Sequence, residues 1–483
     1  MNASLLGPEL VIVGLGLALL LLDLMVPPER RRWLGCVAAA TVFALCTYFI
    51  AQSGRTGEVQ TAFGGMYVLD GLAVYFKALF LLAGGVVLLL AVDWTDHAGH
   101  AVTEYFVLIL FALAGMMLCA SAHDFATLYV SLELVTVTFY VLTSYQRDHV
   151  ASLEAGVKYL ILGALSSAFL VYGIALCYGA AGTMSFTELA SQSPALAGSK
   201  LFQLGMLLVL GGLAFKVALF PFQVWAPDVY EGSPAPTTAF LAVGSKAAGL
   251  VLMVRLFGSV LPDLTLKWEP LLMVISGVSI LYGSLCAIPQ RSLKRLMGYS
   301  SIANGGLLMM GLAAASKAGS AAILFYLAGY LFTVVCAFVV ASVVVQRLGT
   351  DDLTALAGLH RRSPMLAASL TLSMVSLAGV PPLAGFFGKF VLIRALVEQG
   401  ASFPGWYVLI AVALAGVVIS FSYYFRVIKA IYWSGETAEA PPLVLSPLVQ
   451  AALVLCLAGM LALGILPSFV WEAAVAAVAG LRL

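Results

Sequence analysis

Residues 211–240 read GGLAFKVALFPFQVWAPDVYEGSPAPTTAF, and this stretch decides the fold class. It begins as an apolar run typical of a membrane span, yet it contains Lys216, and Pro221 follows in the same run. Proline removes a backbone donor and interrupts a helix. A charged, interrupted helix is tolerated in a bilayer only where it is buried in protein or lines a water-filled cavity. The stretch therefore predicts a membrane protein with a polar interior.

The composition of the whole chain supports that class. Of the 483 residues, 62% are hydrophobic and 10% are charged, and the mean hydropathy of +1.05 is far outside the range of soluble domains. A net charge of +1 without long basic runs gives no indication of a nucleic-acid partner. No motif has the spacing of a nucleotide or metal site. We therefore expect an all-α polytopic protein in the lipid bilayer, with no metal site of its own.

Apolar runs of about 20 residues, long enough to cross a bilayer, divide the chain into about 14 transmembrane helices. They run near 9–25, 34–51, 71–92, 104–121, 124–144, 155–179, 201–221, 235–257, 270–288, 295–314, 318–345, 364–398, 406–432 and 446–467. The loops on one side hold about 12 Lys and Arg against about 5 on the other, which places the richer side in the cytoplasm. Both termini are then expected on the non-cytoplasmic side.

The span near 364–398 is too long for one helix, and it contains Pro381, Pro382 and Lys389. It is a second interrupted helix, like the one that carries Lys216. If spans 4–8 and 9–13 are two five-helix repeats, the discontinuous helices 7 and 12 are each the fourth of their repeat. The odd number of helices then inverts the second repeat, an architecture typical of ion transport at mid-membrane. We expect an N-terminal three-helix segment at 1–103, the two repeats at 104–258 and 259–433, and a C-terminal helix and tail at 434–483.

Five ionisable residues lie within the apolar runs and are the candidate site: Glu133, Lys158, Lys216, Lys246 and Lys389. Each costs about 2.5–3.5 kcal/mol at the centre of a span, so packing alone does not explain them. Burial disfavours the charged form of both residue types, and both can therefore exchange protons near neutral pH. A glutamate beside a lysine then acts as a proton switch. A sodium or metal site would need clustered oxygen ligands, and Glu133 is the single mid-span acid.

Less specific interpretations compete at several positions. Lys77 lies near the start of its span and is expected to snorkel to the interface. Lys158 can pair simply with Glu154, four residues before it. Neutral polar residues near the midplane either hold water between the charges or serve only in helix association. These residues are Thr136, Thr138, Ser166, Ser167, Ser300, Ser301, Asn304 and Thr333.

Five motifs carry a resemblance to a known family. They are SLELVTVTFYVL (131–142), EAGVKYLILGALSSAFLVYG (154–173), FPFQVWAPDVYEGSPAPTTAFLAVGSKAAG (220–249), LKRLMGYSSIANGG (293–306) and LAGVPPLAGFFGKF (377–390). Together they resemble the antiporter-like membrane subunits of bacterial proton-translocating NADH-quinone oxidoreductase, respiratory complex I, and among these subunit N. The resemblance covers essentially the whole chain.

The resemblance implies roles for the five charges. Glu133 matches the glutamate of helix 5 and Lys216 its lysine partner in helix 7. Lys158, Lys246 and Lys389 match the lysines of helices 6, 8 and 12, and the set would form a proton relay. The pattern departs from symmetry in span 10, which has no acid where span 5 has Glu133.

The resemblance also implies what the chain does not do itself. NADH, FMN, Fe–S clusters and quinone would belong to other subunits, and no cofactor is expected in this chain. The partners would be other membrane subunits of the complex, with K and M on its flanks, in the bacterial inner membrane.

Three other functions are compatible with the residues. The first is a cation/proton antiporter or membrane hydrogenase subunit of the same fold. The second is a stand-alone solute transporter. The third is a structural membrane protein in which the buried charges only pair with one another.

Overall fold

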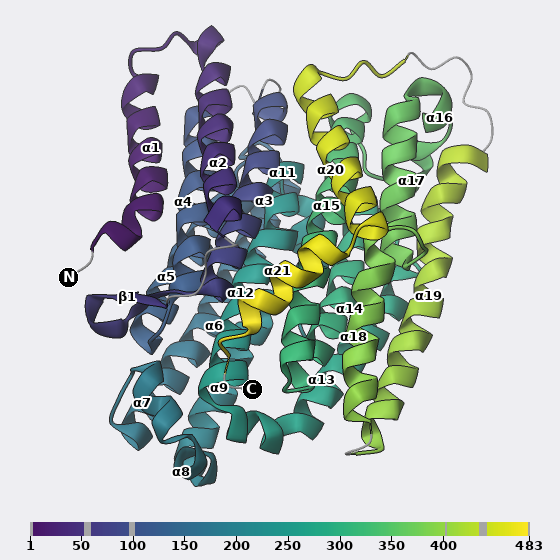
Figure 1. The fold of residues 1–483 in the computed structure, drawn as a ribbon. Helices are drawn as coiled ribbons and strands as arrows, with labels where there is room; N and C mark the ends of the chain where they lie inside the picture. Colours follow the sequence, from purple (N-terminus) through teal and green to yellow (C-terminus); the bar gives the residue numbers. More distant parts are fainter. Residues whose placement is uncertain (1–2, 53–58, 96–101, 401–402, 434–441, 482–483) are drawn as a thin grey trace.

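The computed structural model describes residues 3–52, 59–95, 102–400, 403–433 and 442–481. These residues form a bundle of long helices, most of which run in one common direction (Figure 1). Within the described ranges, 12 helical segments are long and apolar enough to cross a membrane. The chain is therefore a multi-pass membrane protein, as its composition predicts.

The helices and strands have the following bounds. The α-helices are α1 (Gly7–Asp23), α2 (Arg32–Gln52), α3 (Gly71–Thr95), α4 (Val102–Ser121), α5 (Phe125–Thr143), α6 (Val150–Ala181), α7 (Phe186–Ser191), α8 (Ser193–Gly198), α9 (Lys200–Val217), α10 (Ala226–Gly232), α11 (Ala235–Phe240), α12 (Lys246–Arg255), α13 (Pro262–Ala287), α14 (Leu293–Ala313), α15 (Lys317–Leu348), α16 (Leu359–Arg362), α17 (Pro364–Ala378), α18 (Ala384–Gln399), α19 (Gly405–Trp433), α20 (Pro447–Ile465) and α21 (Ser468–Val478). Strands β1 (Gln60–Ala62) and β2 (Tyr67–Leu69) form an antiparallel hairpin.

Short segments of other helical types complete the chain. The 3₁₀ turns are Ala3–Leu6, Pro28–Arg30, Phe63–Gly65 and Leu353–Leu356, and the π-helical segments are Leu241–Ser245 and Leu256–Val260. The two π segments stand at the two ends of α12, so α11, the first π segment and α12 together form the predicted span at 235–257.

The predicted segmentation agrees with the observed helices. Two of the predicted spans are not among the 12 long apolar helices. One is α14, whose first turn carries Lys294 and Arg295, and the other is divided into the shorter helices α17 and α18. Both exceptions are segments whose polar residues or prolines distinguish them from an ordinary lipid-facing span.

The first interrupted helix breaks between α9 and α10. Ala218 takes a left-handed conformation (φ 59°) that ends α9, a conformation that costs about 1–2 kcal/mol for a residue with a Cβ. The break leaves backbone groups without helical partners, and side chains satisfy two of them. Trp225 Nε1 donates to Phe215 O (2.9 Å), and Ser279 Oγ accepts from the N–H of Phe220 (3.0 Å).

The second interrupted helix breaks between α17 and α18. Gly379 ends α17 at φ 86°, a region that glycine reaches without a steric penalty. The N–H of Gly385, in the first turn of α18, donates to Ser376 Oγ (3.2 Å). Hence the two halves are held to each other across the break.

The interrupted helices hold equivalent places in the two five-helix sets. The α9/α10 break follows α4, α5 and α6, and the α17/α18 break follows α13, α14 and α15. The exact repeat boundaries remain predictions: residue 258 falls inside the second π segment, and residues 434–441 lie outside the described part of the chain. The sidedness of the termini also remains a prediction.

The helices at the two ends of the chain lie against the outside of this core. α1 and α2 stand at one side of the bundle, and α21 crosses obliquely over the long helices (Figure 1). α21 lies against α3 and α15, and Lys317 Nζ donates to the carbonyl of Ala479 just beyond it (2.9 Å). The polar site described next lies inside, between α5 and α18.

Candidate functional site

Three of the five predicted charges are buried lysines without a counter-ion. Lys216, Lys246 and Lys389 are 3%, 1% and 7% exposed. Among the described residues, no carboxylate lies within 4 Å of any of the three ammonium groups. Their hydrogen bonds go instead to hydroxyl and carbonyl oxygens. These are the conditions under which a lysine is least costly as a neutral amine.

Lys216 lies in the last turn of α9 and reaches across to α5. Its Nζ donates to Thr136 Oγ1 at 2.6 Å. Glu133, one turn before Thr136 on α5, accepts at Oε1 from Ser167 Oγ of α6 (2.5 Å). The direct Glu133–Lys216 ion pair that the sequence suggests is therefore not formed in this structure, and Lys216 uses a threonine hydroxyl of the same helix α5 as its acceptor instead.

Lys246 is the first residue of α12, directly after the π segment Leu241–Ser245. Its Nζ donates to the carbonyl oxygen and to the hydroxyl (2.6 Å) of Ser301 on α14. The Ser301 hydroxyl also lies 3.1 Å from that of Tyr230, and Tyr330 offers its ring face 5.6 Å from Nζ. π-helical turns are frequent at functional sites, and here the turn places an ammonium among hydroxyl groups.

Glycines bring Lys216 and Lys246 together. A Cβ on Gly249, one turn after Lys246, would lie 3.2 Å from Cβ of Lys216. A Cβ on Gly305 of α14 would lie 3.1 Å from the carbonyl of Val217 and 3.5 Å from Lys246 Nζ. α12 and α14 therefore approach the end of α9 closely, and the first two lysines are neighbours.

A hydrogen-bonded group on α14 and α15 leads on to Lys389. Tyr326 donates to Asn304 Oδ1, and Asn304 Nδ2 in turn donates to the carbonyl of Ser300 (2.8 Å). The ring of Tyr326 stacks on that of Tyr330, with centroids 6.1 Å apart, and so joins the surroundings of Lys246. A Cβ on Gly388, next to Lys389, would lie 2.4 Å from the Tyr326 ring, so this ring reaches the second broken helix.

Lys389 obtains its partner from the helix break itself. Its Nζ donates to the carbonyl of Leu377 (2.6 Å) in the last turn of α17. The last carbonyls of a helix have no helical donors and carry partial negative charge. The break between α17 and α18 therefore supplies an acceptor for an ammonium that has no carboxylate within 4 Å among the described residues.

Lys158 belongs to a different environment. Its side chain is 41% exposed, and its Nζ lies 2.7 Å from Glu154 and 2.7 Å from Asp228. The predicted pair with Glu154 is confirmed, and Asp228 and Arg295 extend it, because Arg295 Nη1 lies 2.7 Å from the Asp228 carboxylate. Lys158 is thus part of a surface charge cluster that joins α6, α10 and α14.

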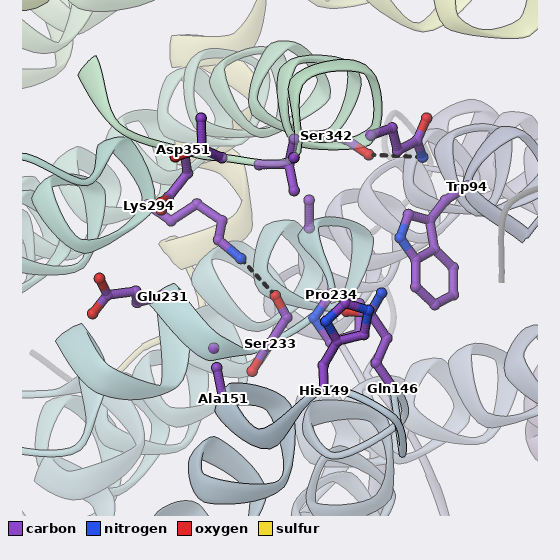
Figure 2. Close-up of a pocket in the computed structure, with 16 residues that line it drawn as sticks. Trp94, Gln146, His149, Ala151, Glu231, Ser233, Pro234, Lys294, Ser342 and Asp351 are labelled. Atoms are coloured by element: carbon purple, nitrogen blue, oxygen red, sulfur yellow. Dashed lines mark hydrogen bonds between the residues drawn. The ribbon is translucent and has the colours of Figure 1, made fainter. Parts of the chain in front are cut away.

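A cavity of about 390 Å³ opens at the end of the bundle that carries the basic loops. Its wall includes Glu231, Asp351 and His149 together with the buried Lys294. Figure 2 shows Lys294 directed across the cavity toward Ser233, whose carbonyl accepts from Nζ at 2.9 Å. Lys294 precedes Ser301 by seven residues on α14, or about 10 Å of helix, so the cavity floor approaches the surroundings of Lys246.

Lys77 differs from its predicted role. The sequence suggests a side chain that snorkels to the interface, but Lys77 is completely buried and lies 2.7 Å from Glu9 Oε1 of α1. Its Nζ also donates to the hydroxyl of Tyr67 (2.5 Å). The expectation is wrong because the N-terminal helix and the β-hairpin cover this turn of α3, an arrangement that position within a span does not reveal.

Sequence reasoning identified the polar residues of the site but not its tyrosines. Thr136, Ser167 and Ser301, noted as polar midplane residues, bond directly to Lys216, Glu133 and Lys246. Tyr230, Tyr326 and Tyr330 were overlooked because aromatic residues are ordinary in membrane spans. A usable signal was present: Tyr326 and Tyr330 are four residues apart in one span, and a hydroxyl buried at mid-membrane must find a partner.

No metal-binding cluster is found in the part of the chain that the structure describes, since no three His, Cys, Asp or Glu residues gather there. The polar groups of the site are hydroxyls, amides and carbonyls around isolated ammonium groups. Such an arrangement is suited to holding and passing protons.

Comparison with known proteins is consistent along the whole chain. Residues 122–420 match the family described as NADH:quinone oxidoreductase/Mrp antiporter, transmembrane. The NADH-quinone oxidoreductase subunit N of Moorella thermoacetica is 38% identical, over 97% of this chain and 96% of that protein.

Solved structures agree with the sequence relatives. A chain of respiratory complex I from Thermus thermophilus is 32% identical with a TM-score of 0.79, over 97% of this chain and 99% of that one. A chain of an archaeal membrane-bound sulfane sulfur reductase is 25% identical with a TM-score of 0.85, over 98% and 97%. With the fold, the family match and the full-length relatives together, this chain belongs to the subunit N family of NADH-quinone oxidoreductase.

Proposed function

We propose that the chain is the proton-translocating subunit N of an NADH-quinone oxidoreductase, with Glu133, Lys158, Lys216, Lys246 and Lys389 as its proton relay. The observation that carries this proposal is the set of three buried lysines on neutral acceptors, at 1–7% exposure, in the interior of the bundle. A charge kept in such a place without a counter-ion is expensive. A role in proton transfer explains why lysines occupy these positions, because each lysine is then charged for only part of the transport cycle.

Protons enter the relay from the cytoplasmic side in this proposal. The cavity at Lys294 has acidic, imidazole and ammonium groups in its wall, which supports water and proton access from that end. From the cavity floor, α14 leads to Ser301 and hence to Lys246. From Lys246, protons then move laterally, toward Lys216 on one side and toward Lys389 on the other.

Glu133 acts as the switch at one end of the relay. Its carboxylate accepts from Ser167, while Lys216 donates to Thr136 one turn along the same helix. When Glu133 turns to Lys216, the ion pair favours the protonated lysine; when it turns away, the buried ammonium loses that support and releases its proton. The separated arrangement of this structure corresponds to the releasing state.

The chain takes part in an enzyme complex as a translocase subunit. We infer that NADH, FMN, Fe–S clusters and quinone are bound by other subunits, and that redox energy reaches this chain through contacts. Subunits K and M would flank it, one at the half-buried Glu133 and one at Lys389. The assembly would lie in the bacterial inner membrane, with both termini of this chain on the outer side.

Two substitutions in the assembled complex test the proposal. Lys216→Ala and Glu133→Ala are each expected to lower NADH-driven proton pumping sharply in inverted membrane vesicles, because each removes one partner of the switch. Lys200→Ala is the matched control, since Lys200 is exposed at the start of the same helix as Lys216. Normal pumping by both variants in fully assembled complexes would contradict the relay.

A further inference from the structure

A second cavity, of about 430 Å³, lies apart from the proton relay. Three segments that the positive-inside rule assigns to the cytoplasmic side meet there. Arg291 follows α13, Asp352 follows α15, and Arg426 and Lys429 lie in the last turns of α19. The cavity is therefore placed where a membrane surface would meet the cytoplasm.

The acidic residue in the cavity wall, Asp352, already accepts hydrogen bonds from within the chain. Asp352 Oδ1 accepts from the N–H of Thr354 (2.8 Å) and from its hydroxyl (2.7 Å). These hydrogen bonds, first of all the one from the backbone N–H, hold the pKa of the Asp352 carboxyl below its ordinary value. Asp352 thus remains ionised and cancels one of three positive charges, which leaves an excess of two.

Of the three basic residues, one is held by hydrogen bonds and two have no ion pair within the described ranges, although Arg291 acts at longer range on Asp352. Arg426 Nη1 donates to the carbonyl of Ile288 (2.5 Å), and Nη2 donates to that of Gln290, so this guanidinium covers the end of α13. Arg291 and Lys429 are exposed, and within the described ranges neither has a carboxylate within 4 Å. Two cations are therefore available to a ligand, beside a third that is held rigidly.

Apolar surface continues from this cavity toward the bilayer. α13 and α19 lie against each other, and the turns below the basic residues leave Leu285, Val418 and Phe425 exposed. A free inorganic anion would use only the basic groups. A molecule with an anionic head and apolar tails would use both parts of the surface.

We propose that this cavity binds the phosphate headgroup of an anionic phospholipid of the cytoplasmic leaflet, with the acyl chains along α13 and α19. Basic pockets between membrane helices on the cytoplasmic side recognise such headgroups. Arg291 and Lys429 contact the phosphate, and Arg426 keeps the helix ends that frame it in place. This site does not depend on the proton relay, and its test requires no pumping.

Photocrosslinking in the assembled complex tests the site. The complex is reconstituted in phosphatidylcholine nanodiscs that contain a small fraction of photoreactive phosphatidylglycerol, and crosslinks to the peptide 414–433 are quantified by mass spectrometry. Unlabelled phosphatidylglycerol should abolish the crosslink, whereas added phosphatidylcholine should not. Arg291→Gln with Lys429→Gln should weaken competition by phosphatidylglycerol by about 10- to 30-fold, from the usual contribution of two basic residues near an anionic surface.

Two further variants separate specific recognition from general charge or folding effects. Arg347→Gln with Arg361→Gln removes the same charge from exposed positions of the same end, outside the cavity, and should behave as the unmodified chain. Arg291→Lys with Lys429→Arg keeps the charges and should keep the preference.

Three outcomes would overturn the assignment. Equal competition by both lipids would exclude charge recognition. Equal competition by inorganic phosphate would indicate a site for a free anion. Capture of Lys429 by an acidic segment of another subunit, with a carboxyl-to-amine crosslinker, would make the cavity a protein interface.

Discussion

In the proposed relay, opposing energies of similar size act on the charge of each buried lysine. A lysine at the centre of a span costs about 2.5–3.5 kcal/mol, and a hydrogen bond to a charged group returns about 1.5–3 kcal/mol. Lys216 donates one such bond to Thr136, and Lys389 donates one to the carbonyl of Leu377. Because the two terms nearly cancel, the approach or departure of the Glu133 carboxylate would decide whether Lys216 is charged.

Thr136 is the residue at which this balance is most directly tested. Thr136→Val keeps the volume of the side chain but removes the hydroxyl that accepts from Lys216, which destabilises the charged lysine by about 1.5–3 kcal/mol. We expect proton pumping per NADH oxidised to fall by roughly half or more, with the complex still assembled. The measurement is the initial rate of NADH-driven acidification of inverted vesicles.

Thr138 provides the control for that substitution. Its hydroxyl donates to the carbonyl of Leu134 within α5 (2.6 Å) and contacts no charged group. Thr138→Val should leave pumping close to normal. If the two valine variants were equally active, the hydroxyl of Thr136 would have no part in the relay.

The identities of the charged residues could be predicted, but several of their partners could not. A charge inside an apolar run is conspicuous, so Lys216, Lys246 and Lys389 follow from the sequence directly. The partner of Lys77 could not be predicted, because Glu9 is 68 residues away in the chain and meets Lys77 only once α1 has packed beside α4 and α2. The acceptor of Lys389 is a backbone carbonyl, which has no signature in a sequence at all.

At the scale of elements, each interrupted helix creates the environment of its own lysine. Lys216 lies in the turn before the first break, and Lys389 lies one turn into α18 after the second. Lys246 is placed differently, by a π segment that leaves its helix unbroken. Prolines and charges within the apolar runs predict both helix breaks. The residues LAVGS (241–245) contain no sequence pattern that predicts a π-helical turn.

Gly385 makes the second helix break sterically possible, and substitution of Gly385 should disrupt the packing of α18 against α17. A Cβ at this position would lie 1.8 Å from the backbone carbonyl of Ser376, so Gly385→Ala must push α18 away from the end of α17. Overpacking of this kind costs about 1–3 kcal/mol or more. We expect a lower thermal unfolding midpoint of the purified complex and a loss of pumping, since Lys389 would move away from Leu377.

Gly179 is the matched glycine for that test. It lies within α6, and a Cβ there would meet nothing within 4 Å. Gly179→Ala should be neutral or should stabilise by up to about 1 kcal/mol, because alanine is the better helix former. Equal unfolding midpoints for the two alanine variants would refute the close approach at the second break.

Across the whole molecule, the proposed relay would run from one side of the bundle to the other. Glu133 of α5, the lysines of α9 and α12, and the tyrosines of α15 lead to Lys389 of α18. The two repeats contribute one interrupted helix each, yet α14 has no acid at the place of Glu133 in α5. The molecule therefore has one acidic end and one basic end, and a row of such subunits would place the basic end of one against the acidic end of the next.

The direction of proton movement depends on the sidedness of the chain, which labelling of introduced cysteines can establish. Asp148 lies in the loop after α5 and Glu188 in α7, and both are exposed at opposite ends of adjacent helices. With the basic loops in the cytoplasm, a membrane-impermeant thiol reagent should label Glu188→Cys, and not Asp148→Cys, in right-side-out vesicles. Inverted vesicles should reverse the pattern, and the unmodified chain reports the background from its own cysteines. Because the cavity at Lys294 opens beside the loop of Asp148, labelling of Asp148→Cys from outside would place that cavity on the outer face, where it would serve proton release instead of uptake.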